Sequence, residues 1–125
     1  MPITIVEERP DSNDATQLIA ELEARLNLLP YPQQSRHGFS VDRLLHEAVT
    51  FFVTRYEGSP AGCGGVKLFG TEYGEVKRMY VRPAYRGLGL GQLMLHHLVE
   101  YARARQVTVL RLETGIYQTA AIGLY

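Results

Sequence analysis

The 125-residue sequence has no tryptophan, one cysteine, no excess of charge of either sign and no long apolar run. The single cysteine, Cys63, excludes an internal disulfide and a cysteine-rich zinc site. The charges of thirteen basic and thirteen acidic residues cancel, which argues against binding of the whole domain to nucleic acid or to an anionic membrane by electrostatic attraction. The chain lacks a stretch as long as a membrane span, and its first residues do not resemble a signal peptide. We therefore expect a cytoplasmic protein with neither a nucleic-acid nor a membrane partner.

Hydrophobic residues make up 46% of the chain, and neither a repeat nor a linker interrupts it, so we predict one domain over residues 1–125. Apolar spacing and turn residues set the expected order of elements. These are a strand at 3–6, helices at 14–29 and 40–47, strands at 50–56, 61–69 and 75–81, a helix at 89–106, a strand at 107–113 and a short helix from 118 to 125. The order βααβββαβα predicts an α/β fold with a mixed sheet, in which an antiparallel meander precedes a parallel βαβ crossover.

The most informative segment is the glycine-rich stretch Arg86–Gly91, which lies between a predicted strand end and a predicted helix start. Unpaired backbone N–H groups and the positive end of the helix dipole meet at such a junction. Glycines at 87, 89 and 91 remove the Cβ atoms that would keep an anion away, and Arg86 adds a positive charge. The pattern favours a phosphate or pyrophosphate site, although a plain glycine-rich turn is the alternative. A P-loop is excluded because no Gly-Lys-Ser/Thr follows, and the glycine spacing does not fit a Rossmann fingerprint.

Arg86–Gly91 also has the R/Q-x-x-G-x-G/A pattern of the GNAT N-acetyltransferase superfamily, which the chain resembles. Residues 75–83 are similar to the fourth strand of that family, and residues 121–125 to its A-I-x-L-Y helix. The resemblance implies acetyl-CoA as co-substrate, with no metal. The residues that it assigns to acetyl-CoA are Met79, Tyr80 and Val81 for the pantetheine arm, Arg86, Gly87, Leu88, Gly89, Leu90, Gly91 and Gln92 for the pyrophosphate, and Gln118, where the family often has Asn, for a further pantetheine contact.

The resemblance also implies two catalytic residues. An amine acceptor is protonated at neutral pH and attacks a thioester only after a base has taken its proton. Glu75 matches the strand-four glutamate that serves some family members as this base, directly or through water, and Tyr125 matches the tyrosine that protonates the leaving thiolate. A solvated strand charge and a helix-end aromatic are the alternative interpretations. Backbone N–H groups near Val81 are expected to stabilise the oxyanion.

Several other residues allow two interpretations. Lys77, Arg78 and Arg82 form a basic cluster that either attracts CoA or is an ordinary solvated strand face. Cys63 is expected to be a small buried strand residue, with an acyl-cysteine intermediate as the alternative. His96 and His97 are adjacent on a predicted helix and point about 100° apart, so we expect surface or packing residues and no shared metal.

We therefore predict an N-acetyltransferase that moves an acetyl group from acetyl-CoA to a primary amine of a small molecule or protein by direct attack. The alternative is a non-catalytic acyl-CoA-binding or sensing module. Because the family pattern continues with two further strands after the position of Tyr125, we expect a C-terminally incomplete domain. The open edge of the strand at 107–113 then favours a homodimer.

Overall fold

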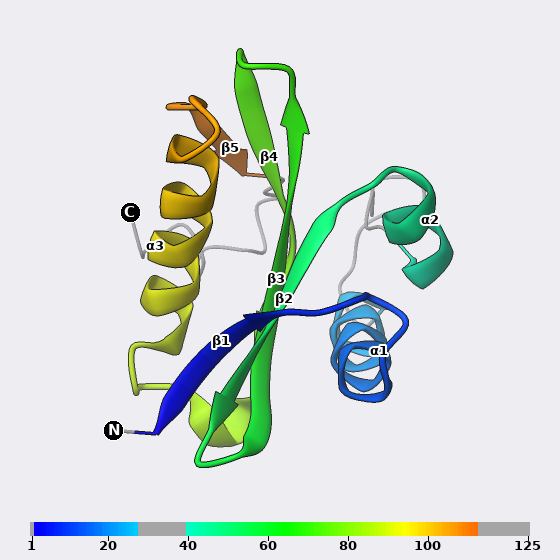
Figure 1. Cartoon of the computed structure of the whole chain (residues 1–125). Coiled ribbons are helices and arrows are strands. Elements are labelled where there is room, and N and C mark those ends of the chain that lie inside the picture. Colours follow the sequence, from blue (N-terminus) through cyan, green and yellow to red (C-terminus); the bar gives the residue numbers. More distant parts are fainter. Residues whose placement is uncertain (1, 28–39, 113–125) are drawn as a thin grey trace.

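The computed structural model describes residues 2–27 and 40–112, and its centre is a five-stranded mixed sheet (Figure 1). The strands β1 (Ile3–Glu7), β2 (Thr50–Tyr56), β3 (Ser59–Phe69), β4 (Tyr73–Val81) and β5 (Leu110–Leu112) lie side by side in chain order. The first four pair antiparallel, and β5 pairs parallel to β4. The predicted meander and parallel crossover are thus confirmed.

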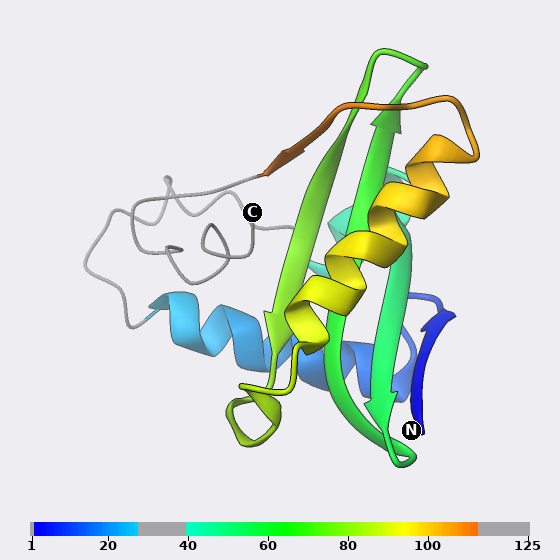
Figure 2. The ribbon, with the colours of Figure 1, turned by 90° about the vertical axis from the view of Figure 1, so that its left-hand side faces the viewer.

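Helices cover both faces of the sheet. Helix α1 (Asn13–Asn27) and the short α2 (Val41–His46) lie on one face, and α3 (Leu90–Arg103) runs along the other (Figures 1 and 2). Serine side chains cap the first two helices, since Ser12 Oγ accepts from Ala15 N at 3.1 Å and Ser40 Oγ accepts from Arg43 N at 3.3 Å.

Two apolar cores follow from this layering. Under α1 and α2 the core holds residues spaced by three and four along α1, together with inward residues of β2 and β3, among them Leu18, Phe51 and Cys63. Under α3 the core is built on helix residues that recur every four positions, among them Met94 and Leu98. Both faces of the sheet are therefore buried at its centre, in β2 and β3.

Most predicted boundaries within the described residues agree with the structure within two residues, and two do not; the predicted helix at 118–125 lies outside the described residues. Leu93 of α3 lies away from the buried stripe and is 42% exposed. Helix α3 ends at Arg103 and not at Gln106, which has a left-handed φ of 67°. Strand β5 begins at Leu110 and not at Val107, because the Val107 N–H closes the helix end by bonding the Ala102 carbonyl at 2.9 Å.

Candidate active site

The predicted pyrophosphate loop leaves the end of β4 through a 3-10 turn at Pro83–Tyr85 and enters α3 at Leu90 (Figure 2). Gly87 and Gly89 have φ values of 85° and 79°, a conformation that side chains rarely adopt, and an added Cβ would meet nothing within 4 Å at either position. The first hydrogen bond of the helix runs from Leu93 N to Gly89 O at 3.0 Å. The N–H groups of residues 90–92 therefore precede the helical ladder and remain available for an anion.

A β-bulge interrupts β4 just before this loop. Cys63 is paired with Tyr80 and Gly65 with Lys77, so a step of two residues on β3 matches a step of three on β4. Arg78, inside the bulge, has a φ of 52°. Alternation would place Val76 and Tyr80 on the same face, yet Val76 packs under α3 and Tyr80 under α1 and α2. The bulge thus reverses the two faces of β4 along its last residues.

The described residues of β5 pair with β4 just before the bulge. The parallel pairing joins Gly74 to Leu110, Glu75 to Arg111 and Val76 to Leu112. Tyr80 and Val81 pair with Cys63 and Gly62 of β3, and within residues 2–27 and 40–112 no strand lies on the other side of Met79–Val81. This stretch of backbone leads directly into the glycine loop, as the binding of an extended ligand arm requires.

The α1-facing side of β4 carries paired charges. Glu75 Oε1 lies 2.9 Å from Lys77 Nζ, and the Lys77 side chain is only 6% exposed. The Arg78 guanidinium, 7% exposed, lies 3.5 Å from Glu23 of α1. Arg82 is bonded to Glu21 at 2.7 and 3.0 Å. The solvated-face interpretation is wrong for Lys77 and Arg78, whose side chains are buried and ion-paired, whereas attraction of CoA by the cluster stays a prediction.

Glu75, the predicted base, is set back from the bulge. It precedes Arg78 by three strand residues, a distance of about 10 Å along the backbone. Its side chain is 31% exposed and reaches the solvent beside Lys77. Of the two predicted routes for the proton, this placement favours transfer through water.

Cys63 is buried beneath the bulge, where its Sγ lies 3.3 Å from the Arg78 carbonyl and donates to it. Burial raises the pKa of the Cys63 thiol to about 12, so the thiol stays protonated at neutral pH and is a poor nucleophile. The expectation of a buried structural cysteine is confirmed. His97 is also a packing residue, since its ring meets Phe52 edge-on at 4.6 Å, while His96 is exposed.

With this geometry established, comparisons with known proteins identify the family. The model of the acetyltransferase (GNAT) family matches residues 15–125. The chain belongs to the GNAT acetyltransferase family. It is 41% identical over 125 residues to an IAA acetyltransferase of Azospirillum brasilense, a match that covers 98% of this chain and 80% of that protein. It is also 34% identical over 85 residues to an uncharacterised N-acetyltransferase of Bacillus subtilis, covering 67% of this chain and 56% of that one.

Solved GNAT structures share the fold. A Klebsiella pneumoniae protein, provisionally described as an acyl-CoA N-acyltransferase, is 36% identical and matches with a TM-score of 0.78 over 99% of this chain and 79% of its own. A GNAT acetyltransferase from Elizabethkingia anophelis, solved with acetyl-CoA bound, has 20% identity and a TM-score of 0.72 over 98% of this chain and 72% of its own. The predicted fold class and the class of enzyme, an acyltransferase, are confirmed.

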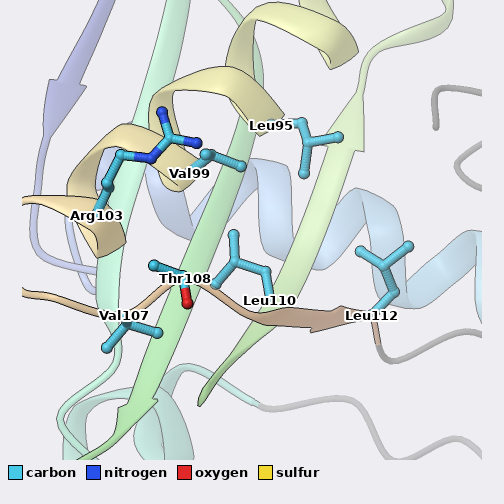
Figure 3. Close-up of a pocket in the computed structure, with 7 residues that line it drawn as sticks. All are labelled: Leu95, Val99, Arg103, Val107, Thr108, Leu110 and Leu112. Carbon is cyan, nitrogen blue, oxygen red and sulfur yellow. The ribbon is translucent and has the colours of Figure 1, made fainter. Parts of the chain in front are cut away.

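A hollow of about 230 Å³ lies elsewhere, between α3 and β5 (Figure 3). None of the predicted site residues lines it. It is lined by Leu95, Val99, Arg103, Val107, Thr108, Leu110 and Leu112.

Among the described residues, no group of three or more His, Cys, Asp or Glu side chains could hold a metal ion. The helices within those residues are also too short or too polar for a membrane span.

The structure brings most predicted site residues to one end of β4, namely Met79–Val81 and the loop from Arg86 to Gln92. Two predicted residues, Gln118 and Tyr125, lie outside the described residues. Glu21 was missed as a neighbour of the site. Its spacing of four residues to Arg25 fits a local helical pair, whereas both its oxygens accept from Arg82 and one also accepts from Tyr80. The signal available in the sequence was the position of the Glu21 carboxylate on a helix face whose other residues have the spacing of core residues.

Proposed function

We propose that this GNAT protein transfers an acetyl group from acetyl-CoA to a primary amine of a small molecule or protein. The observation that carries the proposal is the continuity of the β4 backbone at Met79–Val81, which no described strand pairs on the β5 side, with the N–H groups at the start of α3. An extended thiol-bearing arm ending in a pyrophosphate fits this path, with the pyrophosphate at the loop and the acyl end toward the bulge. The acetyl-CoA-bound Elizabethkingia structure supports acetyl-CoA as the ligand through its shared fold.

The reaction needs little from the protein beyond position, a proton acceptor and a proton donor. The amine, once deprotonated, attacks the thioester carbonyl carbon, and the carbon–sulfur bond breaks as the amide forms. The amine proton leaves toward Glu75 through water, and the CoA thiolate takes up a proton. Backbone N–H groups of β4 after the bulge are the candidate oxyanion donors. Tyr125 is the proposed acid by its match to the family motif alone.

The acceptor is the open part of the proposal. The relative from Azospirillum brasilense is named an IAA acetyltransferase, so IAA should be tested separately from the amine acceptors. A panel of small amines, amino acids and amine-bearing peptides should follow, with thiol release from acetyl-CoA as the assay. We expect release that depends on one acceptor class and matches the acetylated product one to one.

A second candidate is a non-catalytic acyl-CoA-binding module, favoured by one observation. The Glu75 carboxylate is held by Lys77 at 2.9 Å and lies about three residues from the bulge. Saturable acetyl-CoA binding without acceptor-dependent thiol release, across the whole panel, would support the module and contradict the transferase.

A further inference from the structure

The pyrophosphate loop has few anchors of its own. From Pro83 to Gly89 no side chain is buried, and only Tyr85 is partly covered. At its far end Leu90 is 2% exposed and fixes the first turn of α3 in the core. At its near end the anchor is polar and consists of Arg82.

Arg82 joins three segments of the chain. Its Nε and Nη2 donate to the two oxygens of Glu21 on α1 at 3.0 and 2.7 Å, and its Nη1 donates to the Pro60 carbonyl at 3.0 Å. Its backbone N–H donates to the Ala61 carbonyl at 2.8 Å. The start of the loop is thus fixed to α1 and to β3 by one residue.

Glu21 is held in the charged form that this arrangement needs. Hydrogen bonding from Arg82 keeps the pKa of the Glu21 carboxyl below its ordinary value, although burial opposes the shift. The Tyr80 hydroxyl adds a third bond to Glu21, at 3.2 Å. Burial, reinforced by Glu21, raises the pKa of Tyr80, so this hydroxyl remains a donor at neutral pH.

The two arginines beside the loop therefore differ in what they offer an anion. Arg82 has three donors in use and its charge is balanced by a bidentate carboxylate. Arg86 donates from Nε to the Val81 carbonyl at 3.0 Å, and its side chain is exposed. Arg86 is placed to meet a phosphate, whereas Arg82 is placed to hold the backbone.

We infer that the Glu21–Arg82 pair positions the pyrophosphate loop, so that acetyl-CoA affinity depends on a carboxylate of α1 that does not touch the ligand. The inference rests on the proposed function, because it assumes that acetyl-CoA occupies the loop. A loop held in its binding conformation before the ligand arrives loses less conformational entropy on binding. Loss of the pair frees the loop start and weakens binding.

The deciding variant is Glu21→Gln, because the two possible roles of Arg82 predict opposite changes in the affinity for acetyl-CoA. If Arg82 positions the loop through Glu21, the variant binds acetyl-CoA about 10-fold more weakly, a change of about 1.4 kcal/mol. If Arg82 is itself a phosphate ligand, removal of Glu21 frees the guanidinium and tightens binding. Calorimetric titration of acetyl-CoA gives the sign, and the KM for acetyl-CoA should rise while kcat at saturation stays near that of the unchanged protein.

Two further variants complete the test. Arg82→Lys keeps the charge but loses the bidentate geometry, so it should also weaken binding, and it serves if Glu21→Gln fails to fold. Glu100→Gln is the matched control, since it breaks an exposed ion pair with Arg103 on α3, at 3.0 Å, without reaching the loop. Its affinity should be unchanged.

The outcomes separate this inference from the proposed function. Unchanged or tighter binding in Glu21→Gln, with normal binding by the unchanged protein, overturns the positioning role alone, whatever Arg82→Lys shows. If Glu21→Gln fails to fold, unchanged or tighter binding in Arg82→Lys overturns it. Absence of acetyl-CoA binding by the unchanged protein overturns the proposed function and this inference together.

Discussion

Replacement of Gly89 by alanine should weaken acetyl-CoA binding by at least as much free energy as it removes from the stability of the fold. Gly89 has a φ of 79°, and an added Cβ meets no protein atom within 4 Å. The cost to folding is then the left-handed strain of an L-residue, about 1–2 kcal/mol. In the complex the same Cβ projects into the space that the phosphates are expected to fill. Loss of one charge-assisted hydrogen bond costs about 1.5–3 kcal/mol, or roughly 10- to 100-fold in affinity.

Gly70 is the matched control for Gly89→Ala. It lies in the turn between β3 and β4 with a φ of 59°, and its added Cβ also meets nothing within 4 Å. Gly70→Ala should therefore lower the free energy of unfolding by a similar amount and leave acetyl-CoA affinity unchanged. Urea unfolding and calorimetry on both variants make the comparison. Equal affinities for the two variants would refute the assignment of the loop.

Three other outcomes are expected. Glu75→Gln should lower turnover, shift the pH–rate profile toward higher pH and leave acetyl-CoA affinity nearly intact; an unaltered profile would assign the base role to another group. Gly62→Ala should destabilise the protein by about 1–3 kcal/mol in urea, because its Cβ would lie 2.6 Å from the Tyr80 carbonyl oxygen at the bulge; a neutral change would show that the bulge yields easily. Hydrogen bonds from Arg43 and then Lys67 lower the pKa of Glu47 from 4.5 to about 2, so its stabilising contribution is present above pH 4.5 and is lost as pH falls toward 2. Urea unfolding over this range should show a smaller loss of stability in Glu47→Gln than in the unchanged protein.

The parts of the site that depend on local chemistry could be predicted from the sequence. Gly87 and Gly89 lie where the backbone has a positive φ, and glycine adopts this conformation without help from the surrounding structure. The strand that precedes the loop and the helix that follows it are both indicated by apolar spacing. The position of the loop therefore follows from residues that are close together in the chain.

The bulge could not be predicted in this way. It arises from pairing with β3, in which Gly62 admits close approach of the β4 backbone at Tyr80. Arg78 has a left-handed φ although it is not a glycine, and this conformation costs about 1–2 kcal/mol of folding free energy. Such a conformation is set by the partner strand and leaves no local pattern.

Long-range ion pairs were missed for a related reason. Glu21 and Arg82 lie on different elements, and helical spacing favoured a local partner for Glu21. The exposure of Leu93 has the same origin, because the packing of α3 on the sheet decides which of its apolar residues are buried.

A site-resolved titration of amide NMR signals with acetyl-CoA tests the central claim most directly. The account predicts that the largest shifts fall on two groups of amides, Leu88–Gln92 at the loop and Met79–Val81 of β4. The turn at Gly70–Glu72 should stay unshifted. Shifts confined to the hollow between α3 and β5, with none at the loop, would contradict the account.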